Sequence, residues 1–124
     1  MIQILNLILG GIIGTLARYL ISGGIYKAFG SAFPYGTFAV NILGCFLVGF
    51  FASFMDEKIV LNTNLRLLLM VGFCGAFTTF STFIYESYNL IKDGDTLRAF
   101  VNILLSVIVG FLVFTIGIKL GQSI

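Results

Sequence analysis

The sequence predicts an all-α integral membrane protein with four transmembrane helices, and three observations lead to this prediction. Hydrophobic residues make up 59% of the 124-residue chain and charged residues only 10%, a balance typical of membrane proteins rather than soluble domains. The mean hydropathy is correspondingly high, at +1.10. Four charge-poor stretches recur along the chain, each near the ~20 residues that a helix needs to cross the hydrocarbon core. We therefore expect residues 1–124 to form a single four-helix membrane domain.

The expected spans follow one another with short connections. They cover residues 2–22, 35–55, 66–88 and 97–119. The first has neither a basic leading segment nor a clear cleavage site, so we expect a retained span rather than a signal peptide. Pro34 suits the first turn of the second span, where its missing N–H costs little, and Asp95 and Thr96 suit a cap on the fourth. Loops are expected at about residues 22–34, 56–64 and 89–96.

The third expected span contains the least typical stretch of the chain. Residues Gly72–Phe83 read GFCGAFTTFSTF, with two glycines, four hydroxyl side chains and four phenylalanines. Glycine weakens a helix interior, and hydroxyls can bond to freed backbone groups, so we predict that this helix is broken in the middle. Irregular backbone at membrane depth is tolerated only where it is buried in protein or lines a wet cavity. The stretch therefore indicates a place where something polar binds or crosses.

Polar side chains also recur at helical spacing in two other spans. In the second, Thr37, Asn41 and Gly44 share one narrow face. In the fourth, Asn102 and Ser106 are four residues apart and share a face. Each row is compatible with hydrogen bonds between helices or with a polar path through the membrane.

Phe80 and Phe83 lie three residues apart and are expected to share a helical face. Such a stripe commonly serves packing alone. The edge of an aromatic ring is electropositive, however, so two rings turned edge-on could line a path for a small anion. The neighbouring hydroxyls of Ser81 and Thr82 could replace part of the hydration shell of that anion.

Two charged residues lie close to the expected spans. Arg18, near the end of the first, either extends its charged end to the interface or creates an electropositive vestibule that concentrates anions. Glu86 follows the third-span motif and is the only carboxylate within the expected spans. It either sits at the interface or relays protons, and a lone carboxylate favours passive conduction over proton coupling.

The basic residues show almost no bias between the two ends of the spans. Lys58, Arg66 and Lys119 belong to one end, and Lys27, Lys92 and Arg98 to the other. Orientation follows such a bias, so its near absence predicts insertion both ways round and an antiparallel pair of copies about an axis in the membrane plane. The alternative is one orientation imposed by the insertion machinery.

Several function classes are disfavoured. Histidine is absent, and no basic patch indicates a nucleic-acid partner. Cys45 and Cys74 lie inside apolar spans, where they are expected to act as small hydrophobes rather than as a disulfide or metal ligands. No nucleophile–base pair or phosphate-binding loop is recognisable, so we expect no enzyme.

With these residues in view, the whole chain resembles the small fluoride channels of the CrcB or Fluc family. Three motifs carry the resemblance: GxxxGxxxRY at Gly10–Tyr19, GTFxxNxxG at Gly36–Gly44, and GFCGAFTTFSTF at Gly72–Phe83. The second and third, in this order and in these spans, are highly specific.

The resemblance implies an antiparallel, dual-topology homodimer with two fluoride pathways. It implies that Asn41, Phe80 and Phe83 meet the ion and that a polar row carried over as Asn102 and Ser106 helps to line the path, together with the hydroxyls of Ser81 and Thr82. The family often has a tyrosine at Asn102 and a hydroxyl at Gly110. The resemblance also implies a structural sodium ion at the dimer centre, held by the backbone carbonyls of Gly75 and Thr78 from both subunits.

The function expected from the resemblance is passive, fluoride-selective export across the inner (plasma) membrane, which gives resistance to fluoride. One alternative is a proton-coupled fluoride exporter that works through Glu86. Another is a small dual-topology cation exporter, which needs an embedded carboxylate where the first span offers only Gln3 and Asn6. A membrane scaffold without transport activity is a further alternative.

Overall fold

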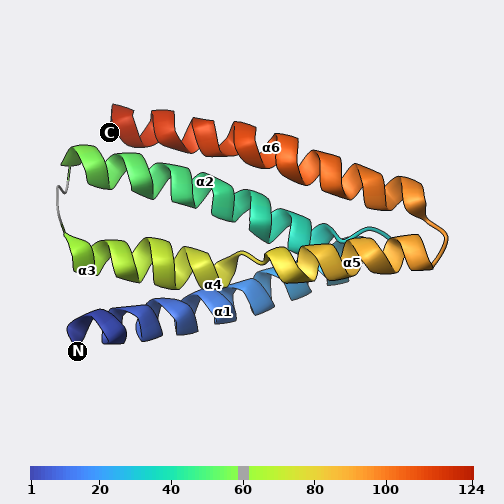
Figure 1. Cartoon of the computed structure of the whole chain (residues 1–124), viewed down its shortest axis with the longest axis horizontal. Coiled ribbons are helices and arrows are strands. Elements are labelled where there is room, and N and C mark those ends of the chain that lie inside the picture. Colours follow the sequence, from blue (N-terminus) through green and yellow to red (C-terminus); the bar gives the residue numbers. More distant parts are fainter. Residues whose placement is uncertain (59–61) are drawn as a thin grey trace.

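The computed structural model describes residues 1–58 and 62–124. Within them lie four helical spans long and apolar enough to cross a membrane, at Ile2–Phe29, Tyr35–Asp56, Thr63–Lys92 and Thr96–Ser123. The spans lie side by side and alternate in direction, so that the N- and C-termini lie at the same end (Figure 1). The predicted all-helical fold with four candidate spans is confirmed.

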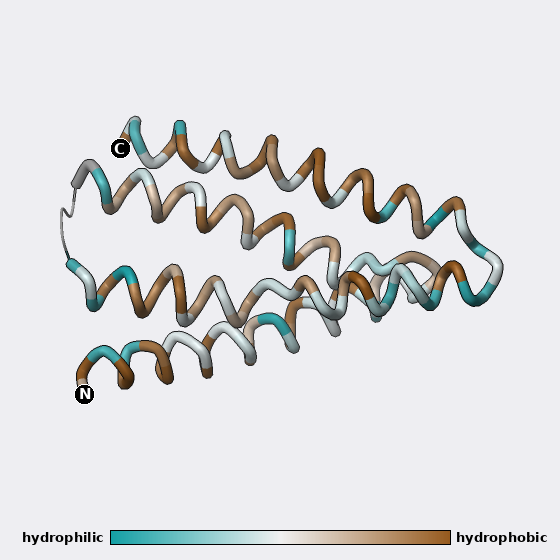
Figure 2. Tube along the Cα trace, in the orientation of Figure 1, coloured by the Kyte–Doolittle hydropathy of each residue, from teal (hydrophilic) through white to brown (hydrophobic). Residues whose placement is uncertain are grey.

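Seven helical segments build these spans. They are α1 (Ile2–Phe29), α2 (Tyr35–Lys58), α3 (Thr63–Arg66), η1 (Leu67–Cys74), α4 (Gly75–Phe77), α5 (Phe80–Lys92) and α6 (Thr96–Ser123). The segment η1 is a π-helix, which is wider than an α-helix. Hydrophobic residues prevail along all four spans (Figure 2), and many large apolar side chains on α1 and α6 are exposed, as a lipid-facing surface requires.

The ends of the helices follow local sequence signals. Helix α1 runs to Phe29 rather than ending near residue 22, and Gly30, with φ at +84°, ends it in a conformation that favours glycine. Asp95 caps α6 as predicted, because its side chain accepts a hydrogen bond of 3.2 Å from the Arg98 N–H. The expected loop at 56–64 includes residues 59–61, which lie outside the described residues.

Small residues allow two pairs of segments to approach closely. Helix α1 packs along η1 and α4, and α2 packs along α6. A Cβ added to Gly10 would overlap the Leu68 carbonyl oxygen, and one added to Gly117 would overlap the Phe46 carbonyl oxygen. Glycine at these positions therefore allows the backbones of the paired segments to approach closely.

The third span changes its neighbours along its length. Its first half, η1 and α4, packs on α1, whereas α5 packs on α6. The change takes place between Phe77, where α4 ends, and Phe80, where α5 begins. In Figure 1 this connection is the thin segment between the labels α4 and α5.

Candidate functional site

Two residues with extended backbone connect α4 and α5. Thr78 has φ −91° and ψ 157°, and Thr79 has φ −149° and ψ 115°. The Thr78 hydroxyl donates a 2.9 Å hydrogen bond to the Cys74 carbonyl, and the Thr79 hydroxyl accepts one of 3.3 Å from the Thr82 N–H at the start of α5. The hydroxyl residues of the motif therefore stabilise both helix ends at this connection.

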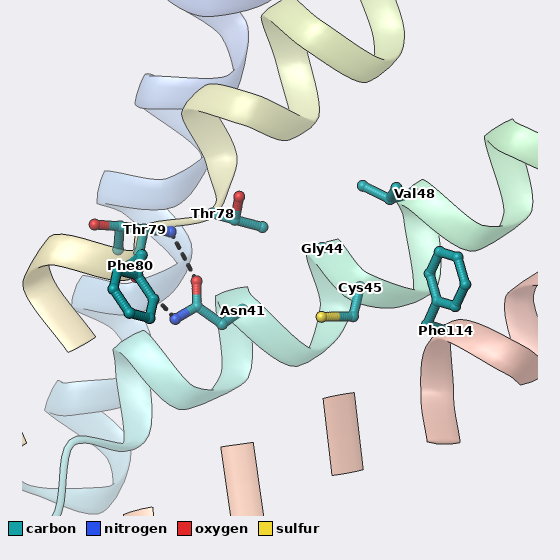
Figure 3. Close-up of a pocket in the computed structure, with 8 residues that line it drawn as sticks. All are labelled: Asn41, Gly44, Cys45, Val48, Thr78, Thr79, Phe80 and Phe114. Atoms are coloured by element: carbon teal, nitrogen blue, oxygen red, sulfur yellow. Dashed lines mark hydrogen bonds between the residues drawn. The ribbon is translucent and has the colours of Figure 1, made fainter. Parts of the chain in front are cut away.

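Asn41 of α2 binds the backbone of this connection through both ends of its amide. Its Nδ2 donates to the Thr79 carbonyl at 3.0 Å, and its Oδ1 accepts from the Thr79 N–H at 2.7 Å (Figure 3). The pair of bonds fixes the orientation of the side chain. Since an amide has two N–H groups and one is used here, Asn41 keeps a second donor.

This arrangement frees two backbone carbonyls. In a continuous helix the Thr79 N–H would bond to the carbonyl of Gly75, but here it donates to Asn41. Likewise the Thr82 N–H, which would bond to the carbonyl of Thr78, donates to the Thr79 hydroxyl. The oxygens of Gly75 and Thr78 thus lose their usual helical partners.

Arg18 of α1 binds α4 just before this connection. Its Nε donates a 3.0 Å hydrogen bond to the Ala76 carbonyl. The side chain is half-buried, and this bond holds it against the third span.

A cavity of about 310 Å³ opens beside the connection. Its lining comes from α2, α6 and the third span and comprises Asn41, Gly44, Cys45, Val48, Thr78, Thr79, Phe80 and Phe114 (Figure 3). Glycine is needed at position 44, because an added Cβ would overlap the methyl group of Thr78. The cavity places the Asn41 amide, a threonine backbone and an aromatic ring around one space.

The two candidate rings differ in their surroundings. Phe80 is 75% exposed, whereas Phe83 is only 7% exposed. Their centroids are 5.9 Å apart and their planes are tilted by 49°. Of the neighbouring hydroxyls, Ser81 is exposed and Thr82 half-buried. The rings therefore meet at the boundary between the bundle interior and its outer surface.

Thr37 lies one turn before Asn41 but belongs to a second cluster. Its hydroxyl donates to Glu86 Oε1 at 2.5 Å, and the Tyr26 hydroxyl donates to Glu86 Oε2, also at 2.5 Å. The carboxylate thus joins α5 to both α1 and α2. The sequence analysis missed Tyr26, whose only signal is that it follows Arg18 two helical turns later.

A third cluster joins α5 to α6. Asn102 is 1% exposed, and its Nδ2 donates to the Ser87 hydroxyl at 2.9 Å. Ser106 donates to the side-chain Oδ1 of Asn102 at 3.4 Å, and Ser87 donates to the Phe83 backbone carbonyl at 2.8 Å. The predicted row of the fourth span is therefore polar and buried at Asn102. Ser87 was missed, although it lies one turn after Phe83.

The two cysteines lie among apolar residues of the helical spans. Cys74 is buried and Cys45 half-buried, both as free thiols. A Cβ added to Gly110 would lie 3.3 Å from the Cys45 sulfur. Within residues 1–58 and 62–124, no group of three or more His, Cys, Asp or Glu side chains could hold a metal ion.

Comparison with known proteins finds one matching family and relatives that share one name. Residues 5–118 match a family described as CrcB-like protein, Camphor Resistance (CrcB). A Geotalea daltonii protein named fluoride-specific ion channel FluC is 50% identical over 115 residues, which cover 92% of each chain. Proteins with the same name from Geobacter sp. strain M21 and Dehalococcoides mccartyi strain CBDB1 are similar too. The first is 42% identical over 98% of each chain, and the second is 46% identical over 97% of this chain and 92% of its own.

Proposed function

Because the chain belongs to the CrcB-like protein family, we infer that it is a fluoride-specific ion channel. The observation that carries this conclusion is the shared name of relatives that align over nearly its full length. The chain is thus a multi-pass membrane protein and not an enzyme. The relatives are named channels, which favours passive conduction over a proton-coupled exporter or a cation exporter.

The proposed fluoride pathway passes the cavity beside the third-span connection. Removal of water from a small, strongly hydrated anion is the main barrier, so the path must offer donors without a fixed countercharge that would trap the ion. The second N–H of Asn41 and the hydroxyls of Ser81 and Thr82 are such donors. The positive ring edges of Phe80 and Phe83 add weaker attraction.

Two further clusters extend the proposed pathway. Asn102 and Ser106 bring an amide and a hydroxyl to the α5–α6 interface next to Phe83. Thr37 lies on the same face of α2 as Asn41 and leads toward the Glu86 end of the bundle. In this proposal Arg18 supplies positive charge near the entry as well as its bond to Ala76.

We propose that two copies form an antiparallel homodimer. Gly75, Phe80 and Ser81, on either side of the extended residues, are exposed in one copy, and Gly75 carries one of the freed carbonyls. Lipid cannot satisfy such groups, so a second copy in opposite orientation is the expected cover. The balanced basic residues of the two ends support insertion both ways.

The backbone oxygens at the connection fit the sodium ion implied by the resemblance. The carbonyls of Gly75 and Thr78 lack their helical partners, and carbonyl oxygens suit a hard cation. Bound there, sodium would neutralise carbonyl dipoles contributed by both copies. Gly75 has open space around it, since an added Cβ would meet only the Met70 oxygen at 4.0 Å.

The physiological role proposed for this channel is fluoride export down its electrochemical gradient across the inner (plasma) membrane, and hence resistance to fluoride. The test is flux from potassium-loaded liposomes that contain the purified protein. A fluoride gradient should collapse when a potassium ionophore balances charge and should persist without the ionophore. A chloride gradient should persist in both cases. Fluoride loss without charge balance would contradict conduction and favour coupled exchange.

The orientation proposal has a separate test. Asp93→Cys places a thiol in the exposed connection between α5 and α6. A thiol reagent that cannot cross membranes should label about half of these thiols in intact cells, with the unsubstituted protein as control for Cys45 and Cys74. Labelling of all or none of them would contradict dual topology.

A further inference from the structure

Arg18 makes a directed contact that its expected vestibule role does not require. The Nε donates to the Ala76 carbonyl at 3.0 Å, across 58 residues of sequence. In a continuous helix, the Phe80 N–H would occupy that carbonyl. Here the first helical part of the third span ends at Phe77, and a side chain from α1 binds the Ala76 carbonyl instead.

The position of the contact suits a cation. The last carbonyls of a helix are unpaired and carry partial negative charge, which a guanidinium group stabilises. The stretch Thr63–Phe77 is helical without interruption, and Ala76 is close to its end. Arg18 therefore stabilises the end of this helix at the depth where the chain becomes extended.

Arg18 and Asn41 together determine which carbonyls stay free. Arg18 occupies the oxygen of Ala76, and Asn41 occupies the oxygen and the N–H of Thr79. The neighbouring oxygens of Gly75 and Thr78 lose their usual donors. Two side chains from different helices thus bind the oxygens of Ala76 and Thr79, each of which directly follows an oxygen that has lost its donor.

We propose that Arg18 is a positioning residue. Through its Nε–H it holds the Ala76 carbonyl and thereby sets the direction of the Gly75 and Thr78 carbonyls toward the sodium ion. This inference rests on the proposed function, because it assumes the sodium site. It differs from a vestibule role because it depends on one N–H at a fixed place rather than on charge.

Three variants separate the hydrogen bond from the charge. Arg18→Gln keeps an N–H donor at the atom that corresponds to Nε, without charge. Arg18→Met has a side chain as long as that glutamine but no hydrogen-bond donor. Arg18→Lys keeps the charge but has carbon at that atom. Wild-type and variant proteins are purified in detergent with N-methylglucamine as the only cation, and sodium is then titrated.

The readout is the sodium concentration that gives half of the maximal rise in the thermal unfolding midpoint, with fluoride flux measured in parallel. Arg18→Gln should match the wild type, whereas Arg18→Met and Arg18→Lys should need about tenfold more sodium, as expected for loss of a hydrogen bond to a charged group. A match for Arg18→Lys but not Arg18→Gln would overturn the proposal in favour of charge, and so would equal behaviour of all variants. If Arg18→Met and Arg18→Lys fail to assemble, the proposal is still overturned when Arg18→Gln departs from the wild type.

Measurements on the wild type distinguish a failure of the proposed channel function from a failure of the sodium site. Absence of fluoride flux would contradict the proposed function. Normal flux without any stabilisation by sodium would overturn the sodium site, and with it the role of Arg18.

Discussion

Replacement of Asn41 by Asp should abolish fluoride conduction, because the change exchanges one N–H donor for a charged oxygen in nearly the same volume. In the structure, the Asn41 Nδ2 lies 3.0 Å from the Thr79 carbonyl oxygen. After the exchange, two oxygens would face each other at that distance. The bond from the Thr79 N–H to Oδ1, at 2.7 Å, would remain.

The expected loss is large. A fixed negative charge about 4 Å from a fluoride ion raises its energy by about 4 kcal/mol at an effective dielectric constant of about 20, which corresponds to roughly a thousandfold lower occupancy. Loss of the donor to Thr79 adds about 1 kcal/mol. Fluoride efflux from liposomes, measured with a fluoride electrode and normalised to reconstituted protein, should therefore fall below detection.

Asn64→Asp is the matched control, since it adds the same charge at an exposed position of α3. It should conduct like the wild type. If Asn41→Asp retains more than about a tenth of wild-type flux, Asn41 does not meet the ion. If both variants lose flux, the effect comes from net charge and not from the pathway.

Three other predictions concern rings, packing and the carboxylate cluster. Phe80→Ile should slow fluoride efflux without loss of folded protein, whereas Phe111→Ile, at a ring that is 69% exposed against 75% for Phe80, should not; equal flux in both variants would show that Phe80 serves packing alone. Gly10→Ala should lower the free energy of unfolding by about 1–3 kcal/mol, since its Cβ would overlap backbone of η1. Gly24→Ala, with nothing within 4 Å, should be neutral or slightly stabilising in the same denaturant titration. Tyr26→Phe should lower that free energy by about 1.5–3 kcal/mol, through loss of a hydrogen bond to the Glu86 carboxylate; an unchanged value would show that this bond contributes no net stability.

The sequence predicts those features that depend on composition and local pattern. Charge-poor stretches locate the spans because lipid excludes charge. Asn41 stands out because an amide inside an apolar span needs a partner. The identity of that partner, the Thr79 backbone, depends on how α2 meets the third span, which no local pattern contains.

Other features lie beyond a reading of helical periodicity. Helical spacing places Phe80 and Phe83 on one face, and both lie in α5, after the extended residues 78 and 79. Phe73 and Phe77, before these extended residues, stack with their ring centroids 5.6 Å apart, whereas spacing does not reveal that Phe80 and Phe83 differ in burial. Tyr26 and Ser87 escaped notice for a similar reason. A tyrosine near a helix end and a serine one turn after an aromatic residue are common, and only their three-dimensional neighbours distinguish them.

The change of neighbours along the third span makes its midpoint sensitive to relative movement of α1 and α6. Tilting α6 relative to α1 would pull α5 one way and α4 the other, and only the short extended connection can absorb the difference. Bilayer thickness is one physical quantity that alters helix tilt. The lipid composition of a vesicle is therefore a variable that acts on the spacing of the central carbonyls without any change of sequence.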